Sequence, residues 1–166
     1  MTGIRPTTMA DVFRLQEVER AAAELFRGSG LIDIDGMAVV SLTDHIASIE
    51  AGLSFVHEAD GRVAGFAIGE WQDRDIYLHE LDVDPAFQQR GIGAGLVRKF
   101  IEAAKAKDAC NIYLATFRDP PWNAPFYRKL GFVDLPRSSY LPWMTAMEEI
   151  QATFLDISTR VFMKLG

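Results

Sequence analysis

The sequence has a single cysteine and no long apolar run, and each absence excludes a class of protein. Cys110 is the only cysteine in 166 residues, so there is neither a disulfide framework nor a multi-cysteine metal site. This cysteine usage favours a reducing, cytoplasmic setting. No apolar run approaches the roughly 18 residues that a membrane span needs. The first residues, "MTGIRPTTMADVFRLQEVER", lack the basic and apolar regions of a secretory signal.

Basic charge is also scarce. The formal net charge is −6 and the pI about 5.0, which argues against a nucleic-acid partner because such proteins usually carry a basic patch. Acidic residues gather in "EWQDRDIYLHELDVDP" (70–85), a segment that hints at a cationic ligand. The composition, 49% hydrophobic and 24% charged residues, fits one globular domain over residues 1–166. It is compatible with a monomer or with a homodimer.

Hydrophobic periodicity predicts an α+β fold with a mixed sheet. Apolar spacing and capping residues predict helices over 7–27, 41–52, 91–108, 121–132 and 138–157. Strand-like patterns cover 53–59, 62–71, 75–83, 111–117 and 158–166, and Asp60-Gly61 predicts a tight hairpin between the first two. The order is α-α-β-β-β-α-β-α-α-β, with an extra strand at each end of the α pairs. We expect helix 138–157 to present one apolar face, which packs on the core or forms a lid; the alternative is a surface for a cofactor or a partner.

Three glycines alternate in "FQQRGIGAGL" (87–96), where a helix begins. Glycine costs about 1 kcal/mol relative to alanine inside a helix, so these residues need a reason. A strand ending at Val83 and a helix starting near Gly91 place them at a helix N-terminus, where free N–H groups favour an anion. Without Cβ atoms, a phosphate can approach that backbone. The alternative is a flexible turn with close helix–sheet packing.

Of three phosphate-binding motifs, only one matches this segment. A Walker A loop needs a lysine–hydroxyl pair that is absent, and the dinucleotide fingerprint GxGxxG fails at Leu96. The remaining pattern, Q/R-x-x-G-x-G/A, is matched by Gln88, Gln89, Arg90, Gly91, Ile92 and Gly93, followed by Ala94. With this motif the chain resembles the GCN5-related N-acetyltransferase (GNAT) superfamily, in which the pattern binds the pyrophosphate of acetyl-CoA. The segment "APFYRKLGF" (124–132) resembles the second signature of that family.

The resemblance implies a GNAT-type fold and a set of coenzyme contacts. The expected sheet is mixed and largely antiparallel, flanked by helices and splayed between the parallel strands 75–83 and 111–117, with coenzyme A in the V-shaped opening. The resemblance implies that Gln88 belongs to the coenzyme-binding motif and that the backbones of Leu81 and Val83 contact the pantetheine arm. It also implies that Asn123 lies near the thioester. The pyrophosphate would be surrounded by backbone amides, those of Gln89, Arg90, Gly91, Gly93 and Ala94. Asn123 and the following Pro125 depart from the family pattern, so the register of Asn123 is open.

The resemblance also implies the catalytic groups. Tyr127, in the "FY" pair, corresponds to the acid that protonates the thiolate, and Glu80 or His79 to the base, with a water-relayed base as a third option. Regular alternation puts Tyr77, His79, Leu81 and Val83 on one side of their strand and Ile76, Leu78, Glu80 and Asp82 on the other. A bulge would shift that parity.

The expected activity is acetyl transfer from acetyl-CoA to a primary amine by direct attack, without a metal. The acceptor is a small cationic amine or a peptide or protein amine. Direct attack needs no cysteine nucleophile, so we expect Cys110 to pack as a small hydrophobic residue. The alternatives are a catalytically silent acyl-CoA-binding module and a transferase of a longer acyl group.

Overall fold

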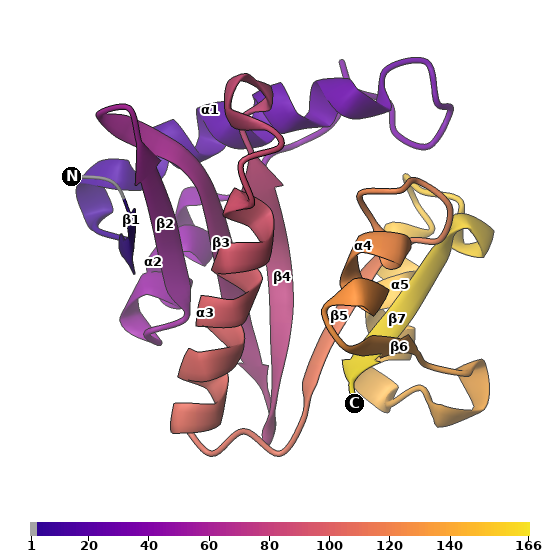
Figure 1. Ribbon diagram of the computed structural model, residues 1–166. Coiled ribbons are helices and arrows are strands. Elements are labelled where there is room, and N and C mark those ends of the chain that lie inside the picture. The colour runs from indigo at the N-terminus through magenta and orange to yellow at the C-terminus, as the bar shows by residue number, and fades with distance from the viewer. Residues whose placement is uncertain (1–2) are drawn as a thin grey trace.

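The computed structural model describes residues 3–166, which form a sheet with helices on both faces (Figure 1). The strands are β1 (Gly3–Pro6), β2 (Ser54–Ala59), β3 (Arg62–Gln72), β4 (Asp75–Val83), β5 (Ile112–Phe117), β6 (Phe132–Asp134) and β7 (Arg160–Leu165). The helices are α1 (Val12–Ala23), α2 (Leu42–Glu50), α3 (Ile92–Ala106), α4 (Ala124–Lys129) and α5 (Pro142–Gln151). The sheet has the order β1-β2-β3-β4-β5-β7-β6.

The sheet is split between β4 and β5. This pair is parallel, whereas every other neighbouring pair is antiparallel, and its register covers only Ile76↔Ile112, Tyr77↔Tyr113 and Leu78↔Leu114. Beyond Leu78 and Leu114 the two strands no longer pair with each other, and their ribbons separate in Figure 1. The predicted fold, a mixed sheet splayed between these two parallel strands, is confirmed.

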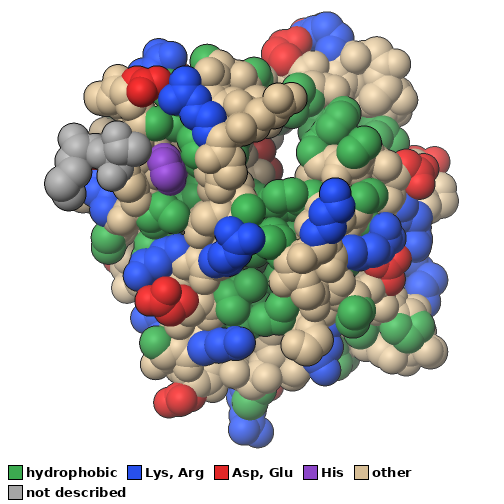
Figure 2. Space-filling view, viewed as in Figure 1, with side chains coloured by type: hydrophobic (Ala, Val, Ile, Leu, Met, Phe, Trp, Pro, Cys, Tyr) green, Lys and Arg blue, Asp and Glu red, His purple; other side chains and the backbone are tan. Residues whose placement is uncertain are grey.

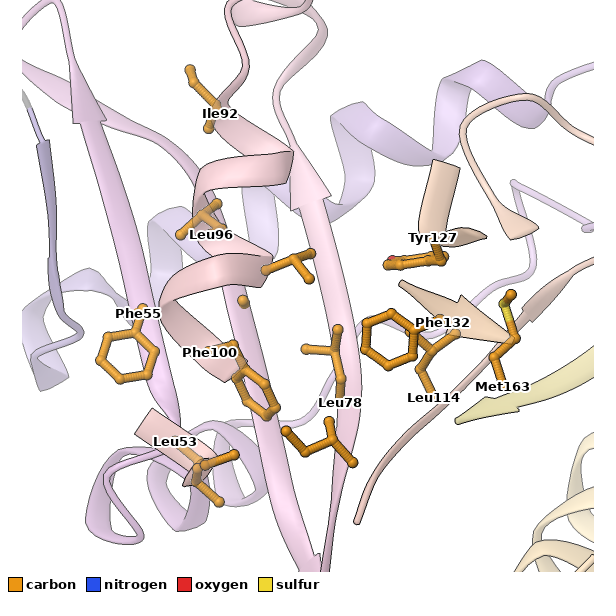
Figure 3. Packing of buried hydrophobic residues seen from close by; sticks show 14 of the residues in the cluster. Leu53, Phe55, Leu78, Ile92, Leu96, Phe100, Leu114, Tyr127, Phe132 and Met163 are labelled. Carbon is orange, nitrogen blue, oxygen red and sulfur yellow. The ribbon is translucent and has the colours of Figure 1, made fainter. Parts of the chain in front are cut away.

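Two helical layers cover the sheet. The larger core lies between the sheet and α3 with α4, and it contains Leu78, Phe100 and Leu114 (Figure 3). On the other face α1 packs over β2 and β3, while Met144 of α5 packs against Tyr77 in a separate cluster. The structure therefore has an α3/α4 face and an α1/α2/α5 face, and the split opens onto both.

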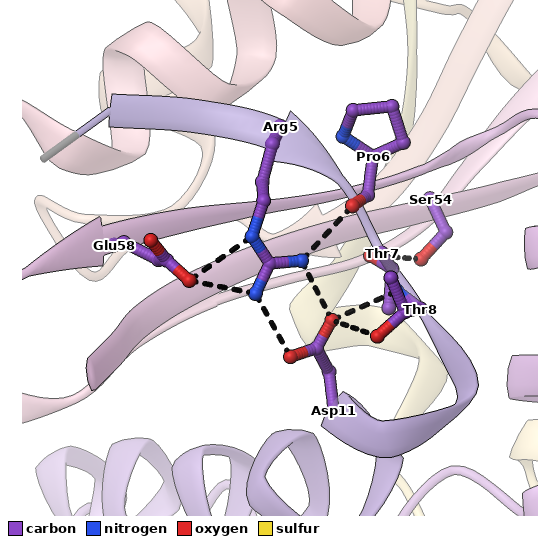
Figure 4. A network of polar contacts seen from close by, with 7 residues as sticks. All are labelled: Arg5, Pro6, Thr7, Thr8, Asp11, Ser54 and Glu58. Atoms are coloured by element: carbon purple, nitrogen blue, oxygen red, sulfur yellow. Dashed lines mark hydrogen bonds and ion pairs between the residues drawn. The ribbon is translucent and has the colours of Figure 1, made fainter. Parts of the chain in front are cut away.

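A polar network fixes the start of α1 to the sheet (Figure 4). The Arg5 guanidinium donates to both Asp11 oxygens, at 2.8 and 3.0 Å, and to Glu58 Oε1 at 2.8 Å. Asp11 Oδ2 also accepts the backbone N–H of Thr8 at 2.8 Å. Because Arg5 lies on β1, Glu58 on β2 and Asp11 just before α1, the network sets the position of α1 over the sheet.

Most predicted elements are confirmed, and the exceptions lie near chain reversals. Ser41 caps α2 by accepting the N–H of Asp44 at 3.1 Å, and both Asp60 and Gly61 have positive φ in the hairpin turn. Phe132, predicted to end a helix, instead starts β6. Helix α5 stops at Gln151, and two residues of its predicted apolar face, Ile150 and Phe154, are exposed. The prediction for Cys110 is also wrong, because this residue is exposed.

Between residues 3 and 166, none of the helices combines the length and apolar character required to cross a bilayer.

Candidate active site

The start of α3 presents backbone amides at the mouth of the split. Gln89 and Gly91 both have positive φ (63° and 74°), a conformation that glycine adopts without the cost that other residues incur. Within α3 the N–H of Gly95 donates to Gly91 O, so the amides of residues 92–94 precede the first of these bonds. No acidic residue lies in this first turn. The helix start is therefore suited to hold an anion.

The glycines of α3 face different surroundings. A Cβ at Gly93 would point toward Val83 and Phe126, 3.7 and 3.5 Å from their nearest atoms, and so toward the split between β4 and α4. A Cβ at Gly95 would instead meet Ile4 of β1 at 3.4 Å. Gly93 is thus the helical glycine that borders the opening, whereas Gly95 serves packing against the edge of the sheet.

Gln88 and Arg90 support the glycine-rich turn with their side chains. Arg90 pairs with Asp60 at 2.9 Å and lies over the Phe87 ring, 5.1 Å from its centroid. Gln88 Nε2 donates to Val83 O at 3.3 Å. Both interactions tie the turn to its surroundings.

A bulge in β4 decides which side chains face which layer. Ile68 pairs with Glu80 and the next residue, Gly69, pairs with Leu78, so His79 is an extra residue without a partner on β3. As a result Glu80 and Asp82 lie opposite Ile68 and Phe66, on the α1/α2/α5 face. The regular alternation predicted for this strand is wrong beyond His79. Leu81 and Val83 lie on the α3/α4 face, where both pack against the core.

Three carboxyl groups meet on the α1 side of the split. Oxygens of Glu19, Glu80 and Asp82 lie within 4.8 Å of one another, a spacing that an ammonium group or a hard cation could use. Burial, with the nearby Glu80 charge, raises the pKa of Glu19 to about 8. Burial likewise raises the pKa of Glu80 and, with the charges of Glu80 and Glu19, raises that of Asp82 well above its usual value. Asp82 Oδ2 is buried without a hydrogen-bond partner.

His79 lies beside this cluster but faces another cavity. Its Nδ1 is 4.0 Å from Glu70 Oε1, and its ring stacks on Tyr77 with centroids 6.1 Å apart. A cavity of about 220 Å³ between α2 and the β3–β4 hairpin is lined by His79, Glu70, Asp44, Ser48 and Trp71. Of the two base candidates, Glu80 is therefore the one that belongs to the carboxyl cluster.

Tyr127 and Asn123 approach the split from α4. Figure 3 shows Tyr127 projecting from α4 toward β4. Burial, together with the charges of Glu80 and Asp82, raises the pKa of Tyr127, so its phenol stays protonated. Nothing among residues 3–166 is hydrogen-bonded to that hydroxyl, which leaves its proton available. Asn123 Nδ2 donates to Thr116 Oγ1 at 2.9 Å, while its buried Oδ1 has no partner.

An aromatic contact spans the outer end of the split. Phe26, just after α1, packs against Phe117 of β5 with ring centroids 5.4 Å apart and against Trp122 at 5.9 Å. These contacts join the α1 layer to the β5–α4 part of the molecule. Trp122 thus covers Phe26 at this edge and remains 45% exposed. Figure 2 shows an opening that passes through the molecule between its two parts.

Glu19 and Arg160 were not among the residues singled out from the sequence. Glu19 lies on the buried face of α1 with Leu15 and Val18. Its position four residues after Leu15 on an apolar helix face could have predicted a buried acid from the sequence. Arg160 alternates with the buried Phe162 in β7, which puts both on the α1/α2/α5 face. Its position near Glu80 depends on the order of the strands in the sheet, so it could not be predicted from the local sequence.

A split mixed sheet with a glycine-rich helix start at its mouth defines the acetyltransferase class of fold. The profile of the acetyltransferase (GNAT) family matches residues 16–132, and the chain belongs to that family. The PaiA N-acetyltransferase from Thermoplasma acidophilum, solved in complex with coenzyme A, has the same fold: the TM-score is 0.76 at 18% identity, with 99% of this chain and 98% of that chain covered.

Curated relatives have different acceptors in their names. The thialysine N-epsilon-acetyltransferase of Bos taurus is 33% identical over 73 residues, covering 42% of this chain and 41% of that protein. The ribosomal protein bS18-alanine N-acetyltransferase of Salmonella typhimurium is 30% identical over 101 residues, 60% of this chain and 68% of that protein. The match thus spans less than half of the bovine relative.

Proposed function

We propose that this protein is an acetyl-CoA-dependent N-acetyltransferase that acts on a primary amine. The observation that carries the proposal is the pairing of a protonated phenol, Tyr127, with a carboxyl cluster around Glu80 at the split between β4 and β5. Family membership and the coenzyme A complex of the Thermoplasma protein support acetyl-CoA as the acetyl donor.

The coenzyme would lie along the α3 side of the split. Beyond Leu78, the edge of β4 that faces β5 has no ladder partner, so the backbones of Leu81 and Val83 can bond a pantetheine arm. The amides of Gln89, Arg90, Gly91, Gly93 and Ala94 suit the pyrophosphate. The unpartnered Asn123 Oδ1 is an acceptor for a donor group near the thioester.

The acid cluster supplies binding and a base for the amine. Repulsion between the carboxylates of Glu19, Glu80 and Asp82 raises the pKa values of Glu19 and Asp82 and so favours their protonated forms. The positive charge of a bound ammonium ion offsets this repulsion. Only the neutral amine has a lone pair for attack, so Glu80 takes one proton from the ammonium ion. Glu80 later releases this proton to solvent. His79 and a water relay are the remaining candidates for this step.

Tyr127 completes the transfer by protonating the leaving sulfur. The amine nitrogen bonds to the acetyl carbon as the carbon–sulfur bond breaks, and the phenolic proton passes to the thiolate. The second proton lost by the amine replaces the one that Tyr127 gives up. Of the two protons lost per turnover, one thus reaches solvent through Glu80 and the other ends on the thiol.

A thiol-release assay with a panel of amines tests this function. Small polyamines, free amino acids and peptides with a free N-terminus are offered with acetyl-CoA, and acetylated products are identified by mass spectrometry. Release of coenzyme A that depends on an amine supports the proposal. Tight acetyl-CoA binding without turnover of any amine would favour the silent module, and turnover only with longer acyl donors would favour the other alternative.

The same thiol-release assay, repeated with EDTA and with added Mg²⁺ or Ca²⁺, tests whether the carboxylates of Glu19, Glu80 and Asp82 bind a metal ion. The proposal requires amine-dependent rates that neither treatment changes. A rate that chelation abolishes would assign the cluster to a metal.

A further inference from the structure

The guanidinium of Arg160 has no hydrogen-bond or ion-pair partner among residues 3–166. Its side chain is largely enclosed, and its Nε is buried without a hydrogen-bond partner. Burial lowers the pKa of Arg160, and no hydrogen bond from residues 3–166 offsets that cost. Six other arginines do have carboxylate partners: Arg5, Arg14, Arg27, Arg90, Arg128 and Arg137. A guanidinium with a buried, unpartnered Nε and no carboxylate in ion-pair distance indicates an anion that the described residues do not supply.

The sheet places Arg160 across the split from the acid cluster. Arg160 pairs with Phe117 at the end of β5, and its guanidinium lies over that ring, 4.6 Å from the centroid. Stacking on the ring fixes the plane of the guanidinium and leaves its edges free to donate. Phe117 and Glu80 project to the same face of the sheet, on opposite sides of the split.

The charges around Arg160 belong to the same site. Tyr77, Glu80 and Tyr127 are the groups whose charges act on it. Yet no carboxylate among residues 3–166 is close enough to Arg160 to form an ion pair. The face therefore offers a carboxyl cluster for a cation on the β4 side and one fixed cation for an anion on the β7 side.

We propose that the acceptor is a small molecule carrying both a primary amine and a carboxylate, with the amine on the Glu19–Glu80–Asp82 cluster and the carboxylate on Arg160. This inference rests on the proposed acetyl transfer. It narrows the acceptor to the amino-acid class, because a guanidinium fork matches a carboxylate with two parallel hydrogen bonds. The N-terminal residue of a long peptide has its α-carboxyl group in an amide bond, so it offers Arg160 no α-carboxylate.

The test compares amino acids with their carboxamides, which differ only in the anion. Initial rates are measured for lysine, alanine and methionine and for the corresponding amides, and kcat/KM is expressed per free amine because amidation changes the basicity of a nearby amine. The parent protein should prefer the acid by roughly 10- to 100-fold, the range for a charge-assisted hydrogen-bonded pair. A parent ratio near one, or activity confined to peptides, would overturn the inference.

Arg160→Met removes the charge while keeping an apolar chain over Phe117. The acid-to-amide ratio should fall close to one, and Arg160→Lys should give an intermediate ratio because the fork is lost. Arg74→Met, which alters an exposed arginine in the β3–β4 turn, should keep the parent ratio. Equal losses for acid and amide in Arg160→Met would mean that Arg160 acts on the reaction and not on the acceptor carboxylate.

Separate measurements distinguish a folding defect from a failure of the proposed acetyl transfer. Circular dichroism and acetyl-CoA-induced thermal shift report whether Arg160→Met is folded. If it is not, the parent ratio and Arg160→Lys decide the question. Absence of acetylation for every amine, with acetyl-CoA bound, would defeat the proposed function itself. Acetylation of amides and acids at equal rates would defeat only the amino-acid inference.

Discussion

The backbone N–H of Val40 donates a hydrogen bond of 2.8 Å to Glu19 Oε1, so the end of the α1–α2 connection is held by a member of the acid cluster. Burial raises the pKa of Glu19 to about 8, from about 4.5 for an exposed glutamate. The folded state therefore keeps a proton that the unfolded chain has lost between these values. Stability contributed by this group is complete below pH 4.5 and falls as pH rises toward 8, by up to about 1.4 kcal/mol per pH unit.

Glu19→Gln should remove this pH dependence. Glutamine keeps the Oε1 acceptor for Val40 and has no proton to lose, so the variant should match the parent near pH 5 and melt at a higher temperature than the parent at pH 8. Thermal unfolding across pH 5–9 measures the difference. Glu149→Gln, at an exposed position of α5, is the control and should follow the parent throughout. A parent-like profile for Glu19→Gln would mean that Glu19 is ionised in the folded protein.

Gly93→Val should separate coenzyme binding from folding. The Cβ at residue 93 would make only ordinary contacts with Val83 and Phe126, so the fold should survive. The branched side chain would nonetheless occupy the approach to the first amides of α3. We expect the thermal shift caused by acetyl-CoA, which follows RT ln(1 + [L]/Kd), to disappear.

The matched control is Gly95→Ala, in the same turn but facing Ile4. It should retain the shift and gain up to about 1 kcal/mol of stability, because alanine replaces glycine inside a helix. An undiminished shift in Gly93→Val would remove the pyrophosphate from the start of α3.

Glu80→Gln should abolish the part of the pH–rate profile that reports the base. Burial raises the pKa of Glu80, so the carboxylate form, and with it the parent rate, grows as pH rises through that value. The parent-to-variant ratio of kcat/KM should increase with pH toward roughly 10²–10⁴. Since the amine titrates equally for both proteins, the ratio isolates the enzyme group. Glu70→Gln, which alters the partner of His79, is the control.

Equal activities of Glu80→Gln and the parent at every pH would eliminate Glu80 as the base. His79→Ala would then distinguish the imidazole from a water relay. Loss of activity in His79→Ala alone would move the base to the bulge residue.

Local signals in the sequence were enough to predict the glycine-rich helix start and most of the element order, although β6 lies between α4 and α5 and not at an end of that pair. Asp60-Gly61 and the Ser41 cap each act within a few residues, so a single sequence carries them. The bulge at His79 was not readable, because it depends on contacts from other elements. Gly69, opposite the bulge, lies beneath the Phe100 ring of α3, and its carbonyl accepts the Ser48 hydroxyl at 2.6 Å.

The same reason limited the prediction of the site. The sequence identified Glu80, but its shared face with Asp82 and Arg160 follows from the bulge and from the strand order β4-β5-β7. Residues from α1, β4 and β7 meet there only after the sheet has formed. Apart from Asn123, the contacts proposed for coenzyme A follow the chain order of one strand–turn–helix unit, which explains why the sequence alone could suggest them.

Tyr127→Phe should impair chemistry without impairing coenzyme binding. The substitution keeps the ring, which packs edge-on against Phe126 and Phe132 with centroids 5.1 and 6.0 Å apart, and removes only the proton donor. Because the ground-state thioester needs no proton, the Kd for acetyl-CoA should change little, whereas the single-turnover rate should fall by roughly 10²–10⁴-fold. Single-turnover measurement is required because slow product release would mask a damaged chemical step.

Tyr113→Phe provides the matched control for this loss. Tyr113 is also buried, but it lies in the cluster beneath α5, where no hydrogen bond to its hydroxyl is made by residues 3–166. We expect its single-turnover rate to stay within about twofold of the parent. If Tyr127→Phe also stays within about twofold, the phenol is structural, and the thiolate must leave unprotonated or take its proton from water. A fall in both variants would instead point to a general loss of core packing, since the two rings lie in separate clusters on opposite faces of the sheet.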